Sequence, residues 1–217
     1  MTMLGQGAVA IWHDVAAEGR DEFYAWHGQE HMPERVGIEG FNRGRRFIAI
    51  DADREFFNLY ETRDADVVKS DAYLARLENP TPWTLSTVRH FRHVARSLCG
   101  VLASTGDADG GPVATLRLAA TDATDAARLG NDLTGLLRTL APLAGIAAVH
   151  VLAADLAASG YANAEQRARG TKNEIPTHIL VVEGWADEAP FMAAVRTLVG
   201  DRGSLGFYRH QITTWPR

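Results

Sequence analysis

The sequence has little cysteine and no long apolar segment. Its 217 residues contain one cysteine, Cys99, which excludes an intrachain disulfide and favours a cytoplasmic location. The apolar neighbours Leu98 and Val101 indicate a buried thiol rather than a nucleophile. No run of about 20 apolar residues occurs, so we expect no membrane-spanning helix. The N-terminus also lacks the basic and apolar regions of a signal peptide.

Positive charge is not in excess, and motifs for nucleotide or thiol chemistry are missing. The 22 Lys and Arg residues face 27 Asp and Glu residues, a formal net charge of −5, which argues against a nucleic-acid partner. No P-loop, G-x-G-x-x-G or C-x-x-C sequence occurs. The hydrophobic content of 46% is sufficient for a substantial core without a metal or disulfide staple. We therefore expect a small-molecule partner rather than nucleic acid or a membrane.

Hydrophobic patterning predicts the same order of elements twice. In the first half it predicts strands at 7–15, 45–50, 55–61 and 86–96 and helices at 18–32 and 64–77. Pro33 is expected to end the first helix at Met32. In the second half it predicts strands at 113–120, 146–153, 176–185 and 207–214 and helices at 122–140 and 187–199. Residues 155–173 are small and polar and are interpreted as an irregular surface segment.

The repeated β-α-β-β-α-β order predicts two similar units. Each unit makes a four-stranded antiparallel sheet with both helices on one face, and its other face is bare. Two such units bury their bare faces by packing sheet against sheet. The glycine- and aspartate-rich segment 104–111 is the predicted linker between domains 1–103 and 112–217. The predicted fold class is α+β, with two ferredoxin-like repeats in one chain that form a pseudo-dimeric α+β barrel.

The first half carries a resemblance to a known family. The stretches AVAIWHD, EHMPERVGIEGFNRGRRF, ETRDADVV and AYLARLENPTPW resemble a group of bacterial proteins near the EthD-type members of the dimeric α+β barrel superfamily, over about residues 8–97. The second half matches in architecture alone, so we expect it to be a degenerate copy. The resemblance implies a site in the cavity between sheet and helices. It also implies a range of activities, from cofactor-free monooxygenases to isomerases, cyclases and haem-binding members, and a fold alone does not select among them.

The segment Trp26–Arg35 is the densest collection of proton-handling groups. His27, Glu30 and His31 spell H-x-x-E-H, and on a helix both histidines lie on one face, about one turn apart. A catalytic zinc needs a third protein ligand, and the sequence offers no clear one. A metal-dependent lyase or hydrolase at His27 and His31 remains an alternative. A third interpretation is that these residues only end a helix beside arginines.

The same residues also suit proton transfer without a metal. His31 or His27 would act as acid or base with Glu30 as partner, and Arg35, Arg43 and Arg46 would bind a carboxylate or enolate. Further candidates for the wall of the site are His13, Tyr60 and Trp83, each of which could equally be a core residue.

The predicted function is a cofactor-independent isomerase, lyase or cyclase. It would act on a carbonyl- or carboxylate-bearing, aromatic-derived catabolite and would exist as a monomer or homodimer. The alternative outside catalysis is a ligand-binding protein.

Overall fold

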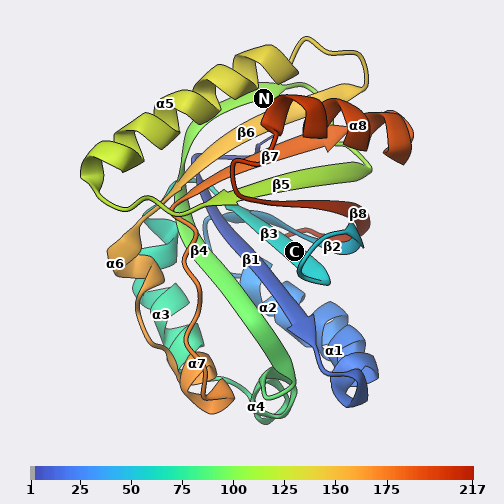
Figure 1. Cartoon of the computed structure of the whole chain (residues 1–217). Coiled ribbons are helices and arrows are strands. Elements are labelled where there is room, and N and C mark those ends of the chain that lie inside the picture. Colours follow the sequence, from blue (N-terminus) through green and yellow to red (C-terminus); the bar gives the residue numbers. More distant parts are fainter. Residues whose placement is uncertain (1–2) are drawn as a thin grey trace.

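Alternating apolar residues build eight antiparallel strands that close into a barrel. The computed structural model describes residues 3–217. The strands are β1 Gly7–Val15, β2 Phe41–Asp51, β3 Phe56–Thr62, β4 Phe91–Gly106, β5 Pro112–Leu118, β6 Ile146–Ala154, β7 His178–Gly184 and β8 Ser204–Thr214. Their order around the barrel is β1-β3-β2-β8-β5-β7-β6-β4. Figure 1 shows the strands wrapped around one interior, with helices outside.

The barrel consists of two units with the same internal order. The first half gives β4-β1-β3-β2 and the second half gives β8-β5-β7-β6. The units join through antiparallel pairing of β2 with β8 and of β4 with β6. The predicted fold class, with two ferredoxin-like repeats in one chain, is confirmed. The domain division at 104–111 stays a prediction, and β4 continues into it as far as Gly106.

Strand alternation separates the barrel interior from the outer faces of the sheets. The interior holds aromatic and aliphatic side chains, among them Trp12, Phe47, Phe57 and Tyr208, which are fully buried. It also holds a buried ion pair across the two halves, in which both Nη atoms of Arg45 donate to Glu183 at 2.9 and 2.8 Å. Side chains from both halves therefore meet in the barrel interior.

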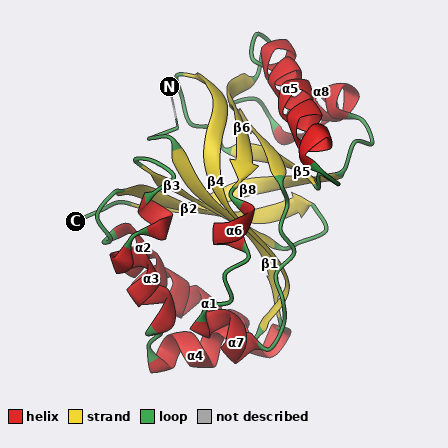
Figure 2. Cartoon of the chain, turned by 90° about the vertical axis from the view of Figure 1, so that its left-hand side faces the viewer, coloured by secondary structure: helices red, strands yellow, loops and turns green. Residues whose placement is uncertain are grey.

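The helices cover the outer faces of the two sheets (Figure 2). They are α1 Arg20–Trp26, α2 Met32–Val36, α3 Asp71–Glu78, α4 Pro82–Val88, α5 Ala123–Leu140, α6 Leu156–Ser159, α7 Ala164–Arg169 and α8 Glu188–Val199. Short 3₁₀ turns occur at Ala17–Gly19 and Val67–Lys69, and a π-helical turn occurs at His27–His31. Helices α5 and α8 fill the space over the second sheet with Leu129, Leu133, Leu137, Phe191 and Val195. None of the helices among residues 3–217 has the length and apolar character needed to cross a bilayer.

Three local predictions were wrong. The first helix does not end before Pro33, because the π-helical turn His27–His31 continues directly into α2, which contains Pro33. Residues 86–88 belong to α4 rather than to a strand, since Thr81 caps that helix and Pro82 begins it. Residues 155–173 are not an irregular surface segment. They form α6, which lies against β4, and α7, which lies against α3 and α4 of the first half (Figure 1).

Candidate functional site

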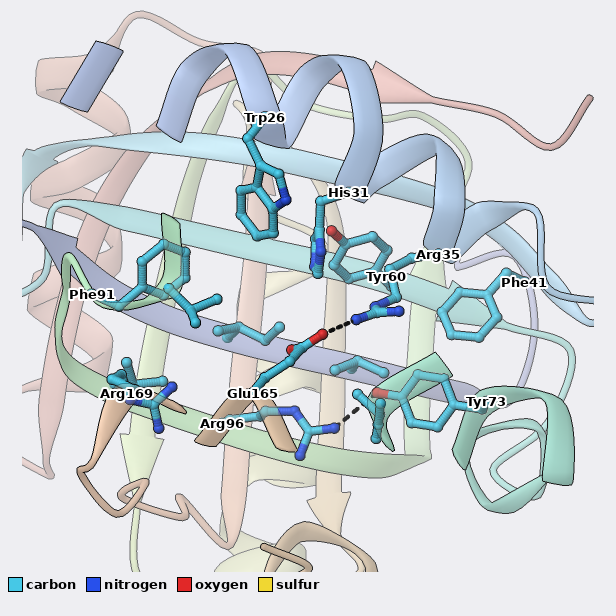
Figure 3. Close-up of a pocket in the computed structure, with 15 residues that line it drawn as sticks. Trp26, His31, Arg35, Phe41, Tyr60, Tyr73, Phe91, Arg96, Glu165 and Arg169 are labelled. Carbon is cyan, nitrogen blue, oxygen red and sulfur yellow. Dashed lines mark hydrogen bonds and ion pairs between the residues drawn. The ribbon is translucent and has the colours of Figure 1, made fainter. Parts of the chain in front are cut away.

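A cavity lies between the outer face of the first sheet and the helices that cover it. Its aromatic and aliphatic walls include Val9, Ile11, Trp26, Phe41, Tyr60, Tyr73 and Phe91. Its charged and polar groups are His31, Arg35, Arg96, Glu165 and Arg169. The space open to the centre of a water molecule is about 60 Å³, which is room for a few waters. Figure 3 shows His31 reaching down from the helix and Glu165 reaching up from α7.

The π-helical turn His27–His31 positions the two histidines of the motif. The N–H of Met32 donates to the carbonyl of His27, five residues back, which widens the helix just before Pro33. The imidazole rings of His27 and His31 then lie nearly parallel, with centroids 5.6 Å apart and planes at 25°. Single π turns inside α-helices are frequent at functional sites.

His31 lines the cavity and its imidazole is buried. Its ring packs on Trp26 with centroids 4.3 Å apart, and the residue is 8% exposed. Burial holds the pKa of His31 well below its usual value, and the nearby Arg35 lowers it further. Its Nδ1 atom is buried and finds no hydrogen-bond partner in the described chain. A neutral imidazole with an unpaired nitrogen can accept a proton from a ligand.

His27 lies behind His31 and connects Arg46 to Tyr60. Nη1 of Arg46 donates to Nδ1 of His27 at 3.3 Å, and Nε2 of His27 is 3.5 Å from the Tyr60 hydroxyl. Burial and the Arg46 charge hold the pKa of His27 well below its usual value. Because a guanidinium only donates, the neutral His27 ring carries its proton on Nε2 and presents it to the Tyr60 oxygen. The Tyr60 O–H is thereby free to donate into the cavity.

His13 is a core residue rather than a wall of the cavity. It is 1% exposed and stacks on Phe91, with ring centroids 4.2 Å apart and planes at 3°. Its Nε2 is 3.1 Å from Nδ2 of Asn58. Burial lowers the pKa of His13 to about 4. The imidazole therefore fills an aromatic cluster beneath the cavity, in its neutral form.

Neither Glu30 nor Trp83 is among the residues that line the cavity. The Glu30 carboxylate accepts from the hydroxyls of Thr81 at 2.6 Å and Thr84 at 3.4 Å, at the start of α4. Among residues 3–217 it makes no hydrogen bond with a histidine. Trp83 packs, partly buried, against an apolar cluster that includes Trp26. The structure thus brings His27, His31, Tyr60 and Arg35 together and places Glu30 with the helix cap instead.

The three arginines of the expected anion clamp lie in different places. Arg35 lines the cavity, and Arg46 stands behind it beside His27. Arg43 lies in the barrel interior, where its Nε donates to Glu61 at 2.7 Å. The reason is strand alternation: Arg43 and Arg46 are three residues apart in β2, so they face opposite sides of the sheet. Arg43 therefore takes no part in the cavity.

The sequence did not reveal that the second half contributes to this cavity. Glu165 and Arg169 come from α7, and Glu165 accepts a hydrogen bond from Nη2 of Arg35. Arg96, on β4, donates to the Tyr73 hydroxyl at 2.8 Å. The capping residue Asn163 marks the start of α7 in the sequence, but nothing local indicates which surface that helix contacts.

The donor set does not favour the metal alternative. Both ring nitrogens of His27 face Arg46 and Tyr60, and Glu30 is bound to threonines. Within the part of the chain that the structure describes, no group of three or more His, Cys, Asp or Glu side chains could hold a metal ion. His27 and His31 therefore have no third protein ligand beside them.

Comparison with known proteins identifies the fold. No protein-family model matches the sequence, and no curated protein matches it. An anthrone oxidase-like protein of known structure is 13% identical, with a TM-score of 0.61 over 96% of this chain and 92% of its own. The "putative monooxygenase" of Lactobacillus acidophilus NCFM is 10% identical, with a TM-score of 0.54 over 97% and 96%. At these identities the likeness shows the fold alone. The chain has the dimeric α+β barrel fold, with both ferredoxin-like units in one polypeptide.

Proposed function

We propose that the protein is a cofactor-independent enzyme, related to the EthD-type members of the superfamily, that removes a proton from a small carbonyl compound. The observation that carries this proposal is that His31 lines a cavity with aromatic sides and that its Nδ1 is buried without a hydrogen-bond partner in the described chain. Proton removal beside a carbonyl is a first step common to those isomerases, lyases and cyclases that proceed through an enolate. The proposal therefore rests on the base and its surroundings rather than on a particular product.

His31 acts as the general base. Its Nδ1 lone pair takes a proton from the carbon beside the substrate carbonyl, the C–H bond breaks, and the electron pair moves onto the carbonyl oxygen. Burial and the Arg35 charge keep the pKa of His31 low, so the ring is neutral and able to accept at neutral pH. A general base of this kind contributes about 10²–10⁴-fold to a rate.

Tyr60 stabilises the enolate oxygen that forms, and the positive charge of Arg35 favours it through space. Because His27 supplies a proton toward the Tyr60 oxygen, the Tyr60 O–H can donate to the substrate. Burial raises the pKa of Tyr60, so it stays a hydroxyl and serves as a donor rather than a base. The Arg35 guanidinium lies 4% exposed at the same cavity, where a positive charge acts through little water. The two groups are thus arranged for a developing negative charge.

The aromatic walls favour a flat substrate. Trp26, Phe41 and Phe91 present rings to the cavity, and aromatic pairs prefer stacked or edge-on contacts. One solved structure with this fold is described as anthrone oxidase-like. Anthrone is a flat ketone with an acidic methylene group, so it is a suitable first compound to test. Because the free space holds only a few waters, α7 has to move outward when a compound of this size binds.

The test is proton exchange on anthrone in deuterated water without oxygen, followed by NMR. We expect exchange by the natural protein and at least about 100-fold slower exchange by His31→Asn, with an unchanged melting temperature. His93→Asn is the matched control, because His93 is exposed and at φ 49°, which asparagine tolerates. Exchange that survives in His31→Asn would overturn the assignment of the base. Oxygen uptake, measured next, separates a monooxygenase from an isomerase.

A ligand-binding protein without turnover is the second candidate. The observation in its favour is that the Arg35–Glu165 ion pair lies at the cavity, which fits a binding protein whose cavity is closed when no ligand is bound. Binding of anthrone with no proton exchange above that of the compound alone would support this alternative.

A further inference from the structure

The charges that line the cavity do not balance. Three guanidinium groups, from Arg35, Arg96 and Arg169, face it together with the single carboxylate of Glu165. Arg35 and Arg96 are 4% and 8% exposed, so little water reaches them. Charges in such surroundings are costly unless they are paired. A bound anion from outside the protein would neutralise this excess of positive charge.

Arg35 uses only part of its hydrogen-bonding capacity. Its Nη2 donates to Glu165, whereas Nη1 is buried without a hydrogen-bond partner in the described chain. Glu34 forms an ion pair with Nη1 at 3.7 Å, which is too long for a hydrogen bond. A free carboxylate binds a guanidinium with two parallel N–H···O bonds. A ligand carboxylate in the place of Glu165 would therefore satisfy Arg35 better than Glu165 does.

A basic hollow lies beside the cavity. It shares Phe91, Val94 and Arg169 with the cavity wall. Its other cations are Arg54, Arg89, Arg92 and Lys172, with His93 beside them and one carboxylate, Glu174. In a chain of net charge −5 this concentration of positive groups is local. Such a hollow raises the local concentration of small anions at the mouth of the site.

We propose that the substrate is a small aromatic carboxylate and that its carboxylate displaces Glu165 from Arg35. This inference rests on the proposed function and names the substrate class of the same site. Without substrate, the Glu165 carboxylate then occupies the position that the substrate carboxylate takes. When the substrate displaces Glu165, α7 moves together with this residue. The outer side of α7 is attached by the exposed Arg167–Glu78 ion pair. Exposed ion pairs contribute little to stability, so breaking this one costs little free energy when α7 moves.

The experiment measures binding of benzoate to the full chain by titration calorimetry, with benzamide as the neutral counterpart. Glu165→Gln removes the competing charge with little change of shape, so we expect benzoate to bind at least about tenfold more tightly than to the natural protein. Benzamide affinity should stay the same. The matched control is Glu188→Gln, which makes the same charge change on α8; it should leave benzoate affinity within about twofold.

Arg35→Gln placed in the Glu165→Gln background should abolish the gain. Equal benzoate affinity in Glu165→Gln and the natural protein would overturn the inference. An equal increase in benzamide affinity would also overturn it, and so would the absence of benzoate binding in every variant.

The binding test is separate from the test of the base. If Glu165→Gln gains nothing while proton exchange still depends on His31, the substrate class alone is wrong. If benzoate binds as expected while exchange does not depend on His31, the proposed function fails and the anion site stands.

Discussion

At the scale of single residues, His13 makes the stability of the protein depend on pH. Its folded-state pKa is about 4 because the ring is buried, whereas an unfolded histidine titrates near its model value of 6.5. Between these values the unfolded chain binds more protons, so stability is lost as the pH falls from 6.5 toward 4. The loss is about 3 kcal/mol for this group. The lowered pKa values of His27 and His31 act in the same direction.

Urea unfolding at pH 7.5, 5.5 and 4.5 measures this dependence. His13→Asn should reduce the slope of stability against pH by about one proton. A slope unchanged by that substitution would contradict the assignment of His13 as a ring kept neutral by burial.

The arginines show what the sequence could and could not predict at this scale. Arg43 and Arg46 were both predicted to bind the substrate. Because side chains alternate along β2, the two arginines lie on opposite faces of the sheet. Had β2 been predicted from Phe41 rather than from residue 45, the sequence would have separated them. Glu165 differs, because it lies 130 positions from Arg35 and no local pattern indicates that pairing.

At the scale of elements, the π-helical turn offers a stabilising substitution. Gly28 lies within this turn, and a Cβ placed on it would meet no atom within 4 Å. Gly28→Ala removes backbone freedom from the unfolded chain and should stabilise the protein by about 0.5–1 kcal/mol. Thermal unfolding measures the gain, and proton exchange on anthrone should be unaffected.

Gly44→Ala should have the opposite effect on stability from Gly28→Ala. A Cβ at Gly44 would lie 2.7 Å from the Tyr60 ring and 3.3 Å from the Met32 methyl group. The ring would have to shift, at a cost of about 1–3 kcal/mol, and Tyr60 would lose its place in the cavity. We expect lower stability and slower exchange together. Gain of stability by Gly44→Ala would show that this close approach is not a constraint.

Element prediction from the sequence succeeded for short apolar runs with clear limits. Strand 7–15 is rich in β-forming residues and begins at a glycine, and it was predicted with the observed bounds. The segment 155–173 could not be predicted in the same way. Helices α6 and α7 are short, and their stability comes from the surface that they cover rather than from an amphipathic pattern.

At the scale of the whole molecule, the buried Arg45–Glu183 pair holds the two halves together. Glu183 is fully buried and accepts from both Arg45 Nη atoms and from the Gly110 N–H. Burial acts to raise the pKa of Glu183, but the facing Arg45 charge outweighs it and holds the pKa far below its usual range. Glu183→Gln leaves Arg45 with a poorer partner and should cost about 3–5 kcal/mol.

Chemical denaturation of Glu183→Gln beside Glu188→Gln checks this prediction. Glu188 is paired with Arg209 at the surface, so its loss should cost no more than about 1 kcal/mol. Equal effects of the two substitutions would mean that the barrel interior contributes no special stability.

The repeated element order was sufficient to predict the barrel, since two sheets with bare faces have few ways to pack. The cavity was harder to predict, because the two halves do not contribute equally. In the second half leucines of α5 fill the space over the sheet, whereas in the first half the corresponding space is left partly open.

The position of α7 has a consequence for how the protein responds to dilution. This helix belongs to the second half of the chain, yet it supplies Glu165 and Arg169 to a cavity in the first half. Two separate units would have to associate before such a cavity was complete, and that association would weaken at low concentration. Within one polypeptide, the tether sets a high effective concentration of one half beside the other. Each molecule therefore keeps a complete cavity however dilute the protein becomes.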